Sequence, residues 1–182
     1  MNRTGRALAL GCLLLLEPLL AAADGNSLLV PALSRCSLDS APADLPQALA
    51  ACQQAASGGD AQAQYELGRF YYEGKQTERD LNQALNYFEQ ASLKGHADAQ
   101  YHLGLMFYRG EGVPANNVQA YIVLKMAAVN GAEDALDSAD EVSASMSKED
   151  LDRATLVLGQ IFRKYLLELQ TADGRTPFSP LP

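Results

Sequence analysis

The sequence is poor in the side chains that usually hold metal ions. Its 182 residues include two histidines, three cysteines and no tryptophan. His96 and His102 are six residues apart, so they do not lie one above the other on a helix as paired metal ligands do. No Cys-x-x-Cys pair is present, and no histidine lies near a cysteine, which argues against a zinc or dithiol site. We therefore expect no metal, and we expect both histidines at the surface.

Basic side chains are also scarce. The chain has 14 lysines and arginines against 22 aspartates and glutamates, which gives a formal net charge of −8. This balance argues against binding to nucleic acid and to anionic membranes. Acidic residues concentrate between positions 133 and 152. They are typical of a solvated helix face, and they also suit a basic partner.

The sequence lacks an apolar run long enough to cross a bilayer. The longest such stretch, residues 7–16, is too short for a span and follows Arg3 and Arg6. Small residues ending at Ala23 complete the pattern of a secretory signal, with cleavage after Ala23. Lipidation at Cys12 is the alternative, although the apolar run continues beyond that cysteine. We expect a periplasmic or secreted protein with no stable membrane insertion.

Motifs for catalysis are missing as well. The sequence has no glycine-rich phosphate loop, no nucleophile elbow and no distinctive carboxylate pair. Residues 145–148 match Ser-x-x-Lys, but neither Ser-Asp-Asn nor Lys-Thr-Gly accompanies them. Ser147 at the start of a helix explains this match better, because serine is a preferred N-cap. We predict no enzyme activity, no catalytic residue and no cofactor.

What the sequence does contain is an internal repeat. Residues 59–74 read GDAQAQYELGRFYYEG, and residues 95–110 read GHADAQYHLGLMFYRG, 36 positions later. Each copy has apolar residues at helical spacing in a first helix, A, followed by a second helix, B. A unit of this kind cannot bury its apolar face alone and must stack on its neighbours. The pattern predicts an all-α solenoid.

Glycines punctuate both copies at equivalent places. Gly68 and Gly104 fall in the middle of the A helices, where glycine costs about 1 kcal/mol relative to alanine. Their recurrence indicates that a neighbouring helix passes too closely for a side chain. Gly74 and Gly110 follow the A helices and are predicted to end them in the left-handed conformation.

The repeat divides the chain into segments. After the signal peptide (1–23) we expect an irregular N-terminal arm (24–43), a repeat domain (44–170) and a disordered tail (171–182). Within the domain lie a half repeat (44–58), two full repeats (59–94 and 95–130) and a degenerate cap (131–170). The cap ends in an amphipathic helix that starts at Ser147 and carries an apolar stripe from Leu151 to Leu169. This helix is predicted to seal the open end of the stack.

Two cysteines, Cys36 and Cys52, remain after removal of the signal peptide. In an oxidising compartment an intramolecular disulfide is expected, and it would tie the N-terminal arm to the first helix. Closing a loop of about 15 residues contributes roughly 3 kcal/mol in the chain-entropy model. A pair of free thiols is the alternative.

The pattern Ala-x-Ala-x-x-x-Leu-Gly-x-x-Tyr/Phe-x-x-Gly, followed by a helix that ends Ala-x-x-x-Gly, resembles the Sel1-like repeats, which are relatives of tetratricopeptide repeats. The second copy also has the family's Gly-x-Gly-Val turn at 110–113, from which the first copy departs at 74–77. The resemblance implies a right-handed α-solenoid that serves as an adaptor in protein complexes, in bacteria often at the cell envelope. It implies no particular partner.

In tetratricopeptide-like stacks the A helices line the concave groove. We therefore predict a protein-binding groove formed by Tyr65, Arg69, Tyr72, Glu73, Tyr101, Leu105, Tyr108 and Arg109. Tyrosine and arginine are favoured at binding hot spots because they bury a large area and keep a polar group available. The alternative for Tyr65 and Tyr101 is packing between repeats.

Other functions suit the same architecture. The resemblance extends to the secreted Sel1-repeat components of sodium-driven flagellar motors. It also extends to cysteine-rich Sel1-like proteins associated with penicillin binding, although those carry a cysteine pair in each repeat and this chain does not. A tyrosine-lined groove also suits a glycan such as peptidoglycan. A short stack with an exposed end is in addition a candidate for dimerisation.

Overall fold

The structure is a computed structural model that describes residues 36–38 and 44–172, with side chains described as far as Glu168. These residues belong to the unit Pro31–Pro182. The predicted signal peptide lies outside the described residues, as do all but three residues of the predicted arm and the last ten residues of the chain. All secondary-structure elements in the described residues are helices, as predicted from the repeat.

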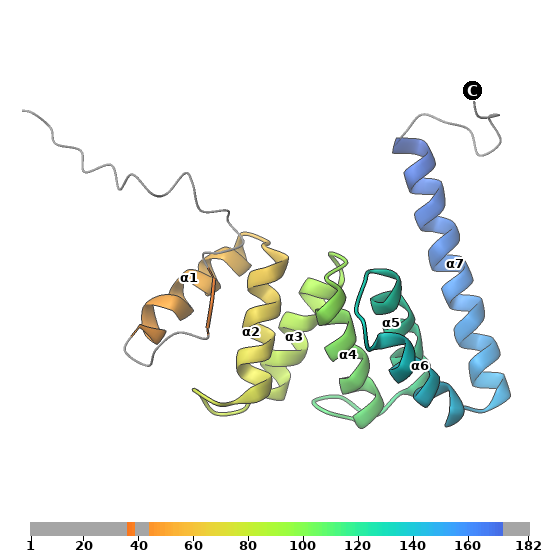
Figure 1. Cartoon of the computed structure of the whole chain (residues 1–182), viewed down its shortest axis with the longest axis horizontal. Helices are drawn as coiled ribbons and strands as arrows, with labels where there is room; N and C mark the ends of the chain where they lie inside the picture. Colours follow the sequence, from red (N-terminus) through yellow and green to blue (C-terminus); the bar gives the residue numbers. More distant parts are fainter. Residues whose placement is uncertain (1–35, 39–43, 173–182) are drawn as a thin grey trace, which may run out of the picture. The chain divides into compact units, whose positions relative to one another are not determined.

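Helices follow one another with short connections (Figure 1). They are α1 (Leu45–Ser57), α2 (Ala61–Glu73), α3 (Leu81–Ser92), α4 (Ala97–Arg109), α5 (Asn117–Val129), α6 (Ala135–Ala144) and α7 (Lys148–Ala172). Helices α2 and α4 are the A helices of the two repeats, and α3 and α5 are their B helices. Each helix from α1 to α5 packs on the next, whereas α7 packs on α5. None of the described helices is long and apolar enough to cross a membrane.

Short polar side chains begin the helices of the repeats. The Asp60 carboxylate accepts a hydrogen bond from the Ala63 backbone N–H at 2.8 Å, and this caps α2. Asp80 caps α3 in the same way through two backbone N–H groups. Asn116 accepts from the Gln119 N–H and caps α5. These caps satisfy N–H groups that have no partner inside the helix.

The glycine predictions are confirmed. Gly74 and Gly110 have φ angles of 62° and 70° and end α2 and α4 in the left-handed conformation. A Cβ atom on Gly68 would lie 2.6 Å from the Phe88 ring, and one on Gly104 would lie 2.7 Å from a carbon of Leu124. Glycine therefore lets each A helix approach the B helix of its own repeat.

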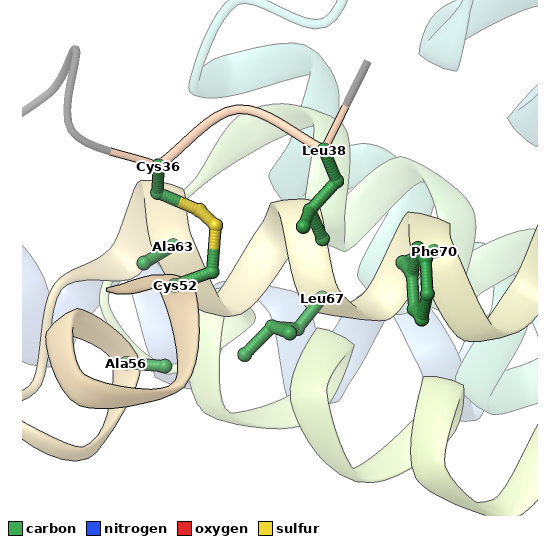
Figure 2. Packing of buried hydrophobic residues seen from close by; sticks show 7 residues of the cluster. All are labelled: Cys36, Leu38, Cys52, Ala56, Ala63, Leu67 and Phe70. Carbon is green, nitrogen blue, oxygen red and sulfur yellow. A yellow bond between two sulfur atoms is a disulfide. The ribbon is translucent and has the colours of Figure 1, made fainter. Parts of the chain in front are cut away.

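The N-terminal end of the stack is closed by a disulfide and a leucine (Figure 2). The predicted bond joins Cys36 to Cys52, which lies on α1. It holds Leu38, which is only 6% exposed, beside Leu67 and Phe70 of α2. This short segment covers apolar surface of the first A helix, α2. Helix α1 also packs against apolar residues of α2.

The C-terminal end is formed by α7, which begins as predicted. Ser147 Oγ accepts a hydrogen bond from the Asp150 N–H at 3.1 Å and donates one to its carboxylate at 2.8 Å. The apolar stripe is buried at Ala154 and Leu158, but Tyr165 is 56% exposed. A 25-residue helix is about 38 Å long, whereas the 13 residues of α5 span about 20 Å. The supporting helix is thus too short to cover the whole stripe.

One boundary differs from the prediction. Helix α7 runs to Ala172, past the expected end of the repeat domain at residue 170. Residues 169–172 contain no glycine or proline, so nothing in their sequence ends the helix. The nearest helix-ending residue in the sequence is Gly174, which lies beyond the predicted boundary at residue 170.

Candidate protein-binding face

The predicted groove residues all lie on α2 and α4, and α6 continues the same row. Helix α2 contacts α4, and α4 contacts α6, so the A helices are direct neighbours (Figure 1). We call this row of helices the A face. Its side chains divide into aromatic rings that pack between repeats and charged groups that reach the surface.

Tyr65 belongs to the packing between repeats. Its ring stacks on His96 with a centroid distance of 4.5 Å, and it lies 6.1 Å from Phe88 and 5.9 Å from His102. Burial raises the pKa of the Tyr65 hydroxyl, and the nearby Asp98 carboxylate adds to this effect. The ring therefore joins the first repeat to the second, in agreement with the packing alternative.

Tyr72 lies in a polar cluster that also joins the two repeats. Its hydroxyl donates to Glu111 Oε2 at 2.7 Å, and Arg79 donates to Glu111 Oε1 at 3.1 Å. The Arg79 Nε–H donates to the backbone carbonyl of Tyr72, and the guanidinium lies 5.0 Å from the centre of the tyrosine ring. Arg109 donates to the Tyr72 hydroxyl at 3.4 Å.

Electrostatics in this cluster follow from its hydrogen bonds. Partial burial tends to raise the pKa of Glu111, but the bonds from Tyr72 and Arg79 outweigh it and lower that pKa. The pKa of Tyr72 is raised by burial and by its bond to Glu111. Glu111 is consequently a carboxylate and Tyr72 a neutral donor over the whole physiological pH range.

The second repeat carries an equivalent but looser arrangement toward α6. The Tyr101 hydroxyl accepts from Ser138 Oγ, and the Tyr108 hydroxyl donates to Glu141 Oε1, both at 3.5 Å. Tyr101, Leu105 and Tyr108 are half-buried against the cluster that contains Val142. Tyr72, Tyr101 and Tyr108 thus link successive A helices through their hydroxyl groups.

Charged groups occupy the outer edge of α2. Arg69 pairs with Glu66 at 3.6 Å and with Glu73 at 3.3 Å, and Lys75 pairs with Glu73 at 2.8 Å. With Leu38 these residues border a cavity of about 60 Å³. Sites for small molecules usually measure about 300 Å³ or more. The cavity is large enough only for a single side chain of a partner.

The sequence did not single out Arg79 and Glu111. Arg79 lies in the turn before α3, and Glu111 lies in the Gly-x-Gly turn after α4. Turn residues far apart in the sequence show no periodic relation, so their pairing becomes visible only when the repeats are stacked. The recurrence of tyrosine at positions 72 and 108 was the one available signal.

Two buried glutamines were also missed. Gln64 Nε2 donates to the carbonyl of Ala56 at 3.1 Å, and Gln100 Nε2 donates to that of Ser92 at 3.0 Å. Each bond runs from an A helix to the end of the preceding B helix. Both side chains are almost fully buried, at 2% and 1% exposure. Their recurrence 36 positions apart was a usable signal for this role.

The expectation of surface histidines is corrected by the structure. His102 is half-buried, and its ring stacks on Phe88 at a centroid distance of 5.0 Å. His96 caps α4 by accepting from the Ala99 N–H at 3.3 Å, while its Nε2 lies 2.8 Å from Gln62 Oε1. Burial lowers the pKa of both rings, so both are neutral at pH 7.

The Ser-x-x-Lys match and the potential metal ligands also have definite places in the fold. In the part of the chain that the structure describes, no three His, Cys, Asp or Glu side chains are grouped as metal ligands. Ser145, the serine of the Ser-x-x-Lys match, donates to the Val142 carbonyl at 2.7 Å and accepts from Asn117 Nδ2 at 3.0 Å. These contacts connect the end of α6 to the start of α5.

Comparison with known families gives an independent assignment of the repeats. The model of the Sel1 repeat matches residues 61–96 and 97–131, each of which covers one A helix and the following B helix. The chain contains two Sel1 repeats. Their bounds agree with the period of 36 residues in the sequence, and Sel1 repeats generally form scaffolds for protein–protein interaction.

Solved structures show the same fold. A protective antigen from uropathogenic Escherichia coli strains, displaying an SLR fold, is 25% identical with a TM-score of 0.65. The match covers 79% of this chain and 31% of that one. A Sel1 repeat protein from Oxalobacter formigenes is 36% identical with a TM-score of 0.53, over 54% of this chain and 29% of that one. This chain thus spans about a third of their length. No curated protein matches it.

Proposed function

We propose that the chain is a periplasmic Sel1-repeat adaptor that binds a protein partner through its A face in a process of the cell envelope. The observation that carries this proposal is the row of charged groups on successive A helices and their turns. They include Arg69, Glu73, Arg109, Glu111 and Glu141. Hydrogen bonds with tyrosine hydroxyls hold Arg109, Glu111 and Glu141 in place.

The geometry favours an extended polypeptide over a compact ligand. Packed helices are separated by about 8–10 Å, so equivalent positions of α2, α4 and α6 recur at that spacing. A peptide lying across the three helices meets a new set of side chains at each step. The small cavity beside Arg69 then takes one side chain of such a peptide.

Charge differs along the A face. On α2 the acidic and basic groups pair with one another, as in the Arg69–Glu73 contact. Asp137 and Glu141 of α6 and Asp134 just before it are exposed, and this helix contains no basic residue. A partner segment with a basic end therefore fits best, with that end over α6.

The proposed location is supported by two features. Arg3, Arg6 and the apolar stretch 7–16 have the pattern of a secretory signal. The Cys36–Cys52 disulfide is typical of proteins in oxidising compartments. Amino-terminal sequencing of the protein recovered from the periplasm tests this point directly, with Asp24 expected as the first residue.

The function is tested by affinity capture from envelope extracts. Arg109→Ala removes an exposed charge of the A face, while Lys148→Ala removes the same charge at the start of α7. We expect Arg109→Ala to lower the recovery of a specific protein about tenfold and Lys148→Ala to leave it unchanged. Equal recovery with both variants would contradict docking at the A face.

A further inference from the structure

Helix α7 presents a regular stripe on the side that faces away from α5. Its members follow the alternating spacing of three and four residues that characterises a coiled-coil seam. They are Glu149, Asp152, Leu156, Gly159, Arg163 and Leu166, and all are exposed. The leucines are prominent, since Leu156 is 65% and Leu166 is 55% exposed. The buried residues Ala154 and Leu158 lie on the opposite side of the helix.

Gly159 has no packing partner among the residues that the structure describes. A Cβ atom at this position would meet nothing within 4 Å, although glycine inside a helix costs about 1 kcal/mol relative to alanine. The other mid-helix glycines, Gly68 and Gly104, each lie under a closely packed helix. By the same physical argument Gly159 marks a place where a further helix crosses α7.

The charges of the stripe indicate which helix this is. Glu149 and Asp150 already pair with Arg153, and this leaves Asp152 near the start of α7. Arg163 lies three turns later on the same side. In the described part of the chain neither Asp152 nor Arg163 forms an ion pair. An antiparallel partner that carries the same stripe brings these two opposite charges together.

We propose that α7 pairs with α7 of a second copy in an antiparallel dimer. A twofold axis midway between Leu156 and Gly159 places Asp152 opposite Arg163 of the second copy. The same axis places Leu156 over Gly159 of the second copy, where the missing side chain leaves room for it. Each contact occurs twice because a twofold interface is self-complementary.

The register is specific to this pairing. A parallel pair would set Asp152 against Asp152 and Arg163 against Arg163, and like charges repel. It would also set Leu156 against Leu156 and leave a gap at Gly159. The antiparallel arrangement therefore pairs opposite charges and also fits each Leu156 into the space at Gly159 of the second copy. This self-complementarity is the reason to assign a second copy as the occupant.

The size of the contact sets the expected affinity. One pair of helices buries less than the roughly 1,200 Å² of a standard interface, which is typical of weak or transient association. We expect a dimer with a dissociation constant in the micromolar range. The A face is not involved, so both chains keep it available, and this inference stands or falls independently of the proposed function.

Analytical ultracentrifugation over a range of protein concentrations tests the dimer. The natural protein is expected to show a reversible monomer–dimer equilibrium. Asp152→Arg and Arg163→Asp each place like charges opposite one another at both symmetric contacts and are expected to raise the dissociation constant about tenfold or more. The double variant D152R/R163D restores opposite charges and is expected to return within about threefold of the natural value.

A control and a second variant complete the test. Glu78→Arg reverses an exposed charge in the turn between α2 and α3 and is expected to leave the equilibrium unchanged. Gly159→Leu fills the space under the crossing helix and is expected to abolish the dimer, while circular dichroism confirms a folded monomer. A natural protein that stays monomeric at ~200 µM overturns the proposal, because this concentration lies well above a micromolar dissociation constant. A dimer insensitive to these charge reversals overturns it as well.

Discussion

Gly68 and Phe88 show how a single missing side chain sets the distance between two helices. The space that a Cβ atom would need at Gly68 is filled by the Phe88 ring, which is fully buried. Such an absence is readable from the sequence because glycine in a helix is unfavourable and recurs here at the same position of both repeats. The contact it permits is local to one repeat, and this is why it was predictable.

The first prediction compares two mid-helix glycines. Gly68→Ala forces a methyl group against Phe88, and overpacking of this kind costs about 1–3 kcal/mol. The gain in helix propensity offsets about 1 kcal/mol, so we expect the free energy of unfolding to fall by up to about 2 kcal/mol. Gly159→Ala, with open space around it, should instead raise it by up to about 1 kcal/mol. Urea unfolding measures both, and equal stability of the two variants would be inconsistent with this packing.

The second prediction concerns pH. Burial holds the pKa of His102 below its usual value, and Arg69 and Arg109 lower it further, against the opposite effect of Asp98 and Glu73. The unfolded chain therefore binds a proton first as the pH falls. The contribution of neutral His102 to the free energy of unfolding is therefore present above the ordinary histidine pKa of about 6.5. It is lost progressively as the pH falls below that value.

Urea unfolding at pH 7.5 and pH 5.5 tests this dependence. The natural protein should be less stable at the lower pH, and His102→Phe, which keeps a ring against Phe88, should lose a smaller part of its stability. His96 contributes in the same direction, so some dependence remains in the variant. An identical change in the two proteins would show that His102 does not titrate on unfolding.

At the scale of elements, the helices were predictable and their contacts less so. Apolar spacing, capping residues and the period of 36 residues define α2 to α5, because these signals are local or repeated. The disulfide followed from the two cysteines that remain after the predicted signal peptide. The role of Leu38 beside Leu67 and Phe70 was not predictable, since the short segment around it has no periodicity.

The candidate site shows the same division. The stripe of tyrosines was recognisable, but the pairing of Tyr72 with Glu111 joins residues that are 39 positions apart. The histidines were misplaced because their burial depends on rings supplied by the preceding repeat, above all Phe88. Contacts between repeats depend on how the units stack, and one sequence alone carries little information on that geometry.

The third prediction belongs to the first helix. The disulfide closes a loop between Cys36 and Cys52, which are 16 positions apart. Its loss should lower the free energy of unfolding by about 3 kcal/mol in the chain-entropy model. Urea unfolding of the natural protein with and without a reducing agent measures this change. The variant Cys36→Ala should match the reduced protein and should itself be indifferent to the reductant, and a reductant effect on this variant would point to another cause.

On the scale of the whole molecule, the two proposals assign separate tasks to two separate surfaces. The A face holds charged groups from α2, α4 and α6 at the spacing of packed helices, which suits an extended partner. The outer stripe of α7 carries leucines, a glycine and opposite charges in a seam that suits a second copy. If both proposals hold, the dimer presents two scaffolds, each with a free A face, to its partners.

The fourth prediction separates the two faces of the repeats. A photoreactive residue is introduced at Arg109 on the A face or at Glu89 on α3, both of which are exposed. The adducts formed in the native envelope are then identified by mass spectrometry. The account predicts a discrete adduct with another protein from position 109 and none from position 89. Adducts from position 89 alone, or none from position 109 in a folded protein, would contradict docking at the A face.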